Sequence, residues 1–406
     1  MTTSIPQIPD ILSAEFAANP HPHYKVMRDH YPVLHHELSG YYFLSRFADV
    51  ERAYRDSEAF SNVNYGFQME PVIGRTVIQM GGHEHAVNRA LITPTLRGKY
   101  LESFTPQVES NAVSMIDKFR HRGEVELIEE FTKWYPINVV VDMLDLPLAD
   151  MPIFHNWYSS LMAFLSNLTR DPDIHEWGMR TQKEFPEYMM PVIAERRRNP
   201  GTDLISRLTQ AETDGETMTD ERIKALVGLL FIAGGETTDK AIANCMRHLL
   251  DNPEQLAELR ADPSLVTNAV AESLRFAPPV QIILRTAVND IEVAGTLIPG
   301  GSTVACVNGA ANRDERRFEN PDTWNMHRTD LTFEQAFSGA ADHIAFALGR
   351  HFCVGSLLAK REMEIAVVKL LEVMPDVRWA DGFTPVDAGL FTRAPQELRL
   401  QFTPVN

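Results

Sequence analysis

Cysteine is scarce in this chain, which has only Cys245, Cys306 and Cys353 among its 406 residues. Three thiols cannot build a dense disulfide framework, and such scarcity is typical of proteins from a reducing compartment. The sequence therefore argues against a secreted, disulfide-stapled protein.

Positive charge is also in short supply. Lys and Arg number 38 against 55 Asp and Glu, which gives a formal net charge of -17. Neutralising the phosphates of a nucleic acid requires clustered Lys and Arg, so a general nucleic-acid-binding function is excluded.

Long apolar runs and linkers are missing as well. No uninterrupted apolar stretch of about 18 residues occurs, so the sequence predicts no membrane span. Residues 1–19 are polar and acidic and lack the basic and apolar regions of a signal peptide. Because no Gly/Ser-rich linker, low-complexity tract or internal repeat divides the chain, we expect residues 1–406 to form one domain.

The sequence does contain 44% hydrophobic residues, enough for a packed core. From Glu84 to Leu250 apolar residues recur three and four apart, which predicts helices, except that Val139 to Leu144 is predicted as a short strand. Residues 280–308 alternate instead and contain the turn Pro299-Gly300-Gly301, which predicts a small β region. Shorter strands are expected at 40–45 and 397–402. The expected fold class is mainly α with small β regions.

The most specific local pattern, F-x-x-G-x-x-x-C-x-G, surrounds Cys353. Gly349 permits a tight turn that a residue with a Cβ resists. The helix predicted over residues 356–374 points its positive end at the sulfur, which favours thiolate over thiol. A thiolate held in this way can be an axial ligand of haem iron. The alternative is a buried structural cysteine, which leaves the glycines and the neighbouring Arg350 and His351 unexplained.

A second pattern, A-G-G-E-T-T, lies in the middle of a long helix predicted over Glu221 to Leu250. Two adjacent glycines cost about 1 kcal/mol each relative to alanine in a helix, and threonine hydroxyls can bond back to a preceding carbonyl and bend the axis. This weak point would let a flat cofactor approach the backbone beside Glu236 and Thr237. The alternative is close helix–helix packing at Gly234 and Gly235, which leaves the acid and the hydroxyls unexplained.

Both patterns resemble those of the cytochrome P450 family of haem-thiolate monooxygenases. The resemblance implies the cytochrome P450 fold, with Cys353 as the ligand of the iron of haem b (iron protoporphyrin IX). Thr237 matches the threonine of the oxygen-binding groove, and Glu236 matches the acid that relays protons. The other residues that the resemblance places at the haem are Ala233, Phe346, Gly349 and Gly355.

Further matches extend the resemblance over residues 22–402. Glu272 and Arg275 match the family's E-x-x-R pair, with Arg328 as the third partner, and are expected to be structural. The donors to the haem propionates are expected to be His85, Arg89, Arg285 and His351.

The resemblance implies a cytoplasmic, prokaryotic-type enzyme that inserts one atom of O2 into a lipophilic small molecule by hydroxylation or epoxidation. Electrons would come from a separate ferredoxin-type donor with its reductase. One alternative is a peroxide-driven haem-thiolate peroxygenase, which is expected to lack the acid–threonine pair. The other is a non-catalytic haem-binding protein, which needs no proton relay.

The substrate pocket is expected to be lined by the loop 62–80, by residues 158–185 and by a set of mostly apolar side chains. These side chains are Leu229, Leu230, Ala233, Ile282, Ile283, Leu390 and Phe391. A basic patch on the Cys353 side could steer an acidic ferredoxin toward the haem, although scattered solvated charge is the alternative. The patch is expected to comprise Arg97, Lys99, Arg350, Lys360 and Arg361.

Overall fold

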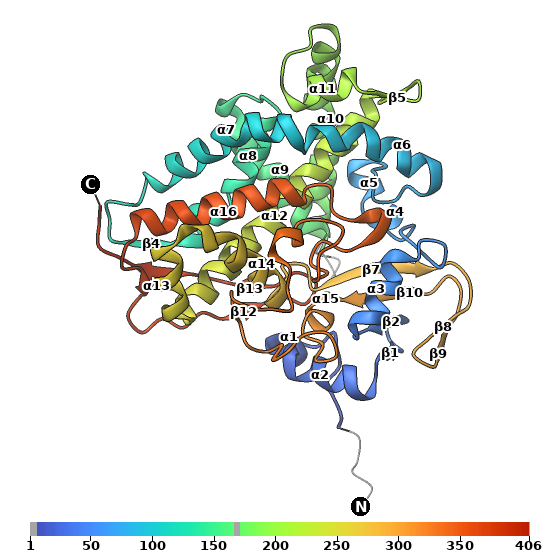
Figure 1. Ribbon diagram of the computed structural model, residues 1–406. Coiled ribbons are helices and arrows are strands. Elements are labelled where there is room, and N and C mark those ends of the chain that lie inside the picture. The colour runs from blue at the N-terminus through green and yellow to red at the C-terminus, as the bar shows by residue number, and fades with distance from the viewer. Residues whose placement is uncertain (1–5, 166–170, 406) are drawn as a thin grey trace, which may run out of the picture.

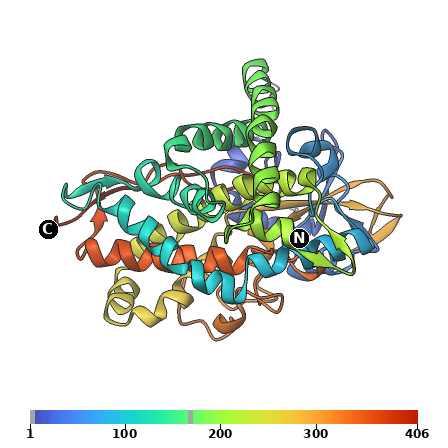
Figure 2. The same ribbon diagram turned by 90° about the horizontal axis from the view of Figure 1, so that it is seen from above.

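The computed structural model describes residues 6–165 and 171–405, and most of its helices lie to one side of its main sheet (Figure 1). The expected fold class, mainly α with small β regions, is confirmed. Seen from above, α7 (Gly98–Ile116) and α16 (Ser356–Val373) run side by side across the helical part (Figure 2). Within the described ranges, no helix combines the length and the apolar character needed to cross a membrane.

The long helix α12 (Asp220–Asp251) passes through the helical part and buries side chains along most of its length. It begins after Thr219, whose hydroxyl accepts a hydrogen bond from the backbone N–H of Arg222. The helices that pack against it include α8 (Tyr135–Met143), α9 (Met151–Leu165), α10 (Pro172–Arg198), α14 (Val266–Phe276) and α16. The predicted helix over Glu221 to Leu250 is therefore confirmed, and its packing carries Glu236 and Thr237 into the interior.

The adjacent glycines of α12 do not interrupt the helix, which continues through both of them. A Cβ on Gly235 would lie 2.4 Å from Cδ1 of Ile137 on α8 and 2.8 Å from Cε2 of Tyr158 on α9. A Cβ on Gly234 would meet only Cγ2 of Val140, at 3.4 Å. Close helix packing thus explains Gly235, and the predicted weak point in the helix is wrong.

A five-stranded sheet, in the order β1-β2-β10-β7-β3, forms the second part of the fold. Its strands are β1 (Val33–His36), β2 (Tyr41–Leu44), β3 (Phe60–Ser61), β7 (Ile282–Ala287) and β10 (Thr303–Val307). Along β7, Ile283 and Arg285 point to one face and Ile282 and Leu284 to the other, as the two-residue period of a strand requires. The predicted β region between residues 280 and 308 is confirmed.

Shorter elements complete the chain. The remaining α-helices are α1 (Ala14–Ala18), α2 (Pro20–His30), α3 (Phe47–Arg55), α4 (Tyr65–Gln68), α5 (Glu70–Ile73), α6 (Gly82–Ile92), α11 (Leu204–Gln210), α13 (Pro253–Ala261) and α15 (Asn308–Ala311). The 3-10 turns are η1 (Thr93–Thr95), η3 (Leu148–Asp150), η4 (Pro263–Leu265), η5 (Phe333–Gln335) and η6 (Gly349–His351), and η2 (Ile128–Thr132) is a π-helical turn. The short strands are β4 (Glu124–Glu126), β5 (Glu212–Thr213), β6 (Glu216–Thr217), β8 (Ile291–Val293), β9 (Thr296–Ile298), β11 (Arg378–Trp379), β12 (Asp387–Ala388), β13 (Ala394–Pro395) and β14 (Arg399–Gln401).

The strand predicted at Val139 to Leu144 is wrong, because most of this segment belongs to α8. Its β-branched valines favour a strand locally. However, Pro136 stands in the first turn, where proline suits a helix start. The helix also buries its valines against α7 and α12, and this tertiary burial outweighs the local preference.

Candidate active site

Cys353 lies between η6 and the start of α16. Gly349 adopts a φ of 69°, and a Cβ there would lie 2.7 Å from the carbonyl oxygen of Tyr54 on α3. Only glycine fits this close approach without strain. The backbone N–H of Cys353 donates a hydrogen bond to the carbonyl oxygen of Phe346 at 3.0 Å, which closes the loop around the sulfur.

The three thiols differ in their surroundings. Cys245 and Cys306 are buried, and burial raises the pKa of each to about 12. Cys353 is partly exposed. Burial raises the pKa of its thiol as well, while the backbone N–H groups of Gly355 and Ser356 and the charge of Arg89 act in the opposite direction.

The sequence argument expected the start of α16 to favour the thiolate of Cys353. The backbone N–H groups of Gly355 and Ser356 at this helix start do lower the pKa of the thiol, as expected, but burial outweighs them and the net pKa is raised. A stable thiolate at this position needs an additional positive charge in contact with the sulfur, and a coordinated metal ion supplies one.

Ala233, which is exposed, and Thr237, which is partly exposed, form a strip in the middle of α12. Ala233 is exposed, whereas the adjoining Phe231 and Ile232 are buried. The hydroxyl of Thr237 donates a hydrogen bond to the carbonyl oxygen of Ala233 at 2.6 Å, which is the back-bond that the sequence predicts. The small side chain of Ala233 leaves the backbone of α12 open to a flat group at this strip.

Glu236 is held by two groups that both bind the same carboxylate oxygen. Lys240, one turn later on α12, places Nζ 2.8 Å from Oε1. The hydroxyl of Thr392 donates to the same Oε1 at 2.9 Å. Both contacts leave Oε2 as the oxygen from which Glu236 can give or take a proton.

Cationic and imidazole groups converge beside the Cys353 loop. The rings of His85 on α6 and His351 on η6 lie 4.2 Å apart. Burial lowers the pKa of His85 to about 4 and that of His351 to about 3, with further lowering from nearby guanidinium groups. Arg89 donates to the carbonyl oxygen of Phe352, and the guanidinium of Arg285 stands 4.8 Å over the ring of Tyr54.

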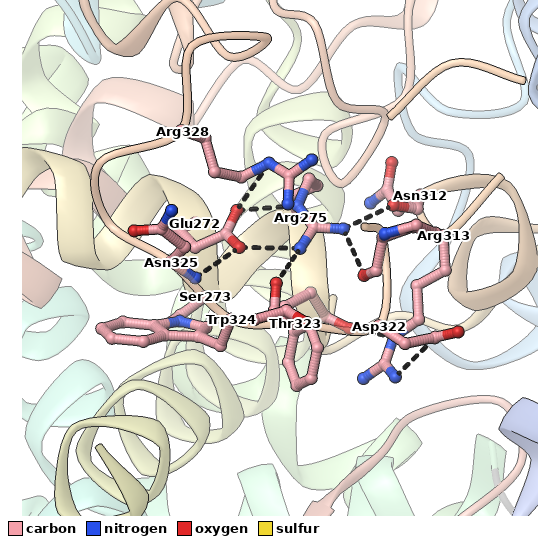
Figure 3. A network of polar contacts seen from close by, with 12 residues as sticks. Glu272, Ser273, Arg275, Asn312, Arg313, Asp322, Thr323, Trp324, Asn325 and Arg328 are labelled. Atoms are coloured by element: carbon pink, nitrogen blue, oxygen red, sulfur yellow. Dashed lines mark hydrogen bonds and ion pairs between the residues drawn. The ribbon is translucent and has the colours of Figure 1, made fainter. Parts of the chain in front are cut away.

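A buried ion-pair network supports this region (Figure 3). Arg275 donates to Glu272 through both Nε and Nη2 at 2.7 Å, and both side chains are fully buried. Arg275 also donates to the carbonyl oxygens of Asn312 and Pro321, at 3.0 and 2.9 Å. Arg328 lies 3.9 Å from Glu272 and pairs more closely with Asp330, at 2.7 Å.

The network reaches the Cys353 loop through Asn312. The side-chain oxygen of Asn312 accepts a hydrogen bond from the backbone N–H of Ile344 at 2.9 Å. Arg275 thus holds α14, the coil after α15 and the approach to the loop in one arrangement, which is the structural role expected of this pair.

Comparison with known proteins places the chain in a family. The family model described as Cytochrome P450 matches residues 151–373. Pulcherriminic acid synthase of Bacillus subtilis (strain 168) is 37% identical over 393 residues, which cover 97% of each chain. Cytochrome P450 107B1 of Saccharopolyspora erythraea is 32% identical over 399 residues, which cover 94% of each chain. The chain belongs to the cytochrome P450 family.

A solved structure agrees with this assignment. CYP109E1 from Bacillus megaterium in complex with corticosterone matches with a TM-score of 0.86 at 26% identity, over 96% of this chain and 99% of that one. The expected cytochrome P450 fold is therefore confirmed. As a member of the family, the protein is an oxidoreductase of the monooxygenase class with a haem-thiolate centre.

The residues of this cytochrome P450 fit a haem. Both ring nitrogens of His85 are buried without a protein partner, and so is Nε of Arg97. Unpaired buried donors of this kind need an acceptor, and the two carboxylates of a haem supply one. The partly exposed thiol of Cys353 and the exposed Ala233 suit the iron and the flat ring.

Most of the side chains expected to line the cytochrome P450 pocket lie near α12 and β7, but they do not share one surface. Leu229 is buried and Leu230 partly buried on α12, and Leu230 lies on the side of Ala233 and Thr237. On β7, Ile283 shares a face with Arg285.

Ile282 instead joins the apolar cluster of the N-terminal helices, against which Leu390 and Phe391 also pack. Ile282 therefore faces away from Arg285 and Ile283, whereas the sequence argument expected Ile282 and Ile283 to line the pocket together. The expected pocket segment 158–185 includes residues 166–170, which lie outside the described residues.

Sequence reasoning missed the partners of Glu236 in this cytochrome P450. Lys240 lies four residues after Glu236, and that spacing on a helix was a usable signal. Thr392 is 156 residues away in the chain, so no local pattern could have found it. Arg97, expected on the surface patch, contributes a buried Nε next to the thiol of Cys353.

Proposed function

We propose that this cytochrome P450 binds haem b through Cys353 and uses O2 to hydroxylate or epoxidise a lipophilic small molecule. The observation that supports it most is the glycine-flanked, partly exposed thiol of Cys353 together with the strip of Ala233 and Thr237. A porphyrin is flat and apolar and carries two carboxylates. The small residues of the strip, the thiol of Cys353 and the cations near its loop suit these three properties.

Bound haem supplies the chemistry of oxygen activation. The chain's own groups hold and move protons. The hydroxyl of Thr237 donates to Ala233, so its oxygen can accept a hydrogen bond from a water and hold that water at the strip. Glu236 hands protons to this water from Oε2, because Lys240 and Thr392 occupy Oε1.

The propionates of haem b would be bound by His85, Arg89, Arg285 and His351. A carboxylate between these groups raises the pKa of both histidines, because a nearby negative charge favours the imidazolium. Burial lowers the pKa of both histidines, to about 4 and about 3, and a propionate beside them would act against that lowering.

We propose a ferredoxin-type electron donor, with its reductase, that docks on the Cys353 side. Lys99 and Arg350 are exposed there. Lys360 and Arg361 each approach Glu364, at 3.5 and 3.8 Å, so Glu364 offsets part of their charge. Lys99 and Arg350 should therefore dominate attraction of an acidic partner.

Charge reversal tests this docking side. Lys99→Glu with Arg350→Glu should slow reduction by the ferredoxin at low salt and little at high salt. Arg198→Glu, on an exposed side chain at the end of α10, is the matched control and should leave the rate unchanged. Equal reduction rates for all variants at every ionic strength would contradict the docking side.

A lipophilic substrate is supported by the apolar residues of α12 and by the corticosterone bound to the neighbour CYP109E1. A panel of steroids, fatty acids and terpenoids should include compounds that shift the haem absorption band on binding. Such compounds should give oxygenated products with NADH, ferredoxin, reductase and O2. Product from hydrogen peroxide alone, and none from NADH, would contradict the proposal and assign a peroxygenase instead. We also propose the cytoplasm as the location and residues 1–406 as one domain, on the sequence argument alone.

A further inference from the structure

A second acid, which the proposed function does not use, stands one turn after Glu236 on α12. Asp239 is only 7% exposed. Burial raises its pKa to about 6. A buried carboxyl that can hold a proton near neutral pH is unusual in the interior, and a purely structural carboxylate would be better served by a full ion pair.

The groups around Asp239 come from three elements. From η2, the hydroxyl of Thr132 donates to Oδ1 of Asp239 at 2.6 Å, and Lys133 directly follows. From α12 itself, Lys240 lowers the pKa of Asp239 and Glu236 raises it. From α9, Tyr158 has a pKa that burial raises, and the charges of Asp239 and Glu236 raise it further.

The order of these groups around α12 leads away from the strip. Successive helix residues are about 100° apart, so Glu236 lies roughly 60° from Ala233 and Asp239 roughly 120° in the same direction. Thr132, at the end of the π-helical turn η2, stands beyond Asp239. Around α12, Glu236 therefore lies between the strip and Asp239, and Thr132 binds Asp239.

We propose that Asp239 resupplies Glu236 with protons from the side of η2. This inference rests on the proposed function, since it names the source of the protons that Glu236 delivers. Thr132 occupies Oδ1 of Asp239, and Lys240 and Thr392 occupy Oε1 of Glu236. The oxygens left to carry the proton are therefore Oδ2 of Asp239 and Oε2 of Glu236, on side chains three residues apart on α12.

The balance of the step is simple. Glu236 becomes neutral and Asp239 becomes a carboxylate, whose charge the ammonium groups of Lys133 and Lys240 stabilise. Asp239 then takes up a proton that comes from solvent on the side of η2, and the residue as a whole is 7% exposed. No electrons move. Asp239 acts only through Glu236 and touches neither the substrate nor the cofactor.

The competing explanation is that Asp239 only ties η2 to α12. Asp239→Asn separates the two roles, because the amide oxygen can still accept the hydrogen bond of Thr132 but the side chain no longer carries a proton. We expect this variant to form several-fold less product per NADH, with more hydrogen peroxide released. In the wild type, product per NADH should fall as pH rises through about 6, and in Asp239→Asn it should not respond to pH there.

Two further variants serve as controls. Asp142 on α8 is another partly buried acid whose pKa is raised by burial, and it accepts a hydrogen bond from Asn111 at 2.8 Å. Asp142→Asn should behave as the wild type. Thr132→Val removes a hydrogen bond that favours the charged form of Asp239, so the pH response should move to higher pH.

Infrared difference spectra of the resting protein between pH 5 and 7 provide a readout that is independent of turnover. In the wild type and in Asp142→Asn, a band of a protonated carboxyl should disappear as the pH is raised from 5 to 7. In Asp239→Asn this change should be missing. If the wild type forms product and Asp239→Asn matches it in product per NADH and in pH response, the proton supply by Asp239 is refuted. If no compound gives product with the wild type, the proposed function fails, and this inference with it.

Discussion

Two adjacent glycines on α12 should respond in opposite ways to the same substitution. Gly234→Ala and Gly235→Ala each gain about 1 kcal/mol of helix propensity. The new methyl of Gly234→Ala would meet only Val140, at an ordinary contact distance of 3.4 Å. That of Gly235→Ala would stand 2.4 Å from Ile137 and 2.8 Å from Tyr158, and both of these side chains are buried.

The propensity gain is common to both variants, so their difference isolates the overpacking cost. Forcing a methyl into a packed core costs about 1–3 kcal/mol. We therefore expect Gly235→Ala to be less stable than Gly234→Ala by about 1–3 kcal/mol, with Gly234→Ala at or slightly above the wild type. Urea denaturation of the haem-loaded protein, followed by tryptophan fluorescence and haem absorbance, measures this difference.

A double-mutant cycle identifies the clash. Ile137→Val removes the Cδ1 atom nearest to the new methyl and by itself costs about 0.5–1.5 kcal/mol. On the Gly235→Ala background the same change should cost less or stabilise the protein, with a coupling energy of about 0.5–3 kcal/mol. Equal stabilities of the two glycine variants, or strict additivity in the cycle, would refute the packing account of Gly235.

The remaining predictions concern the site. Cys353→Ser should abolish the haem-thiolate absorption of the reduced, CO-bound protein, because a hydroxyl is a poor substitute for a soft sulfur donor. An unchanged spectrum would show that another residue is the ligand. Thr237→Ala should keep the fold and substrate binding, but more of the NADH consumed should end as hydrogen peroxide. If product per NADH is unchanged, the hydroxyl of Thr237 only makes its hydrogen bond to Ala233. Arg275→Met should destabilise the protein by about 3–5 kcal/mol, since it removes the two-bond partner of the fully buried Glu272 and leaves only Arg328, at 3.9 Å, to balance its charge; urea midpoints check this, with exposed Arg198→Met as the control. Asp239 has a folded pKa of about 6, above its ordinary value of 3.8, so its contribution to stability is greatest below pH 3.8 and is lost as pH rises through 6, by about 3 kcal/mol. Stability curves of Asp239→Asn should lack this loss, and identical curves for variant and wild type would contradict the raised pKa.

Local patterns predicted the elements that depend on short spacings. The helix around Glu236, the helix after Cys353 and the strands between residues 280 and 308 are all found close to where the periodicity places them. The failure at Val139 to Leu144 has a physical cause, because β-branched residues favour strands locally and burial against α7 and α12 decided for a helix.

The sequence predicted where helices and strands occur better than it predicted which face of a strand each side chain occupies. The sequence placed Ile282 and Ile283 together in the pocket, but adjacent strand residues point to opposite sides of a sheet. The two-residue period puts Ile283 on the side of Arg285, and the packing of the sheet puts Ile282 against the N-terminal helices.

By itself, the sequence determined the family and predicted the thiol ligand and the acid–threonine pair, because each depends on residue types at fixed short spacings along one segment. Tertiary structure decided the electrostatics. Burial raises the pKa of Cys353 although the start of its helix lowers it. Folding of the chain brings Thr392 to Glu236, which lies 156 residues away in the sequence. Desolvation and long-range contact are properties of the packed chain, and no window of sequence contains them.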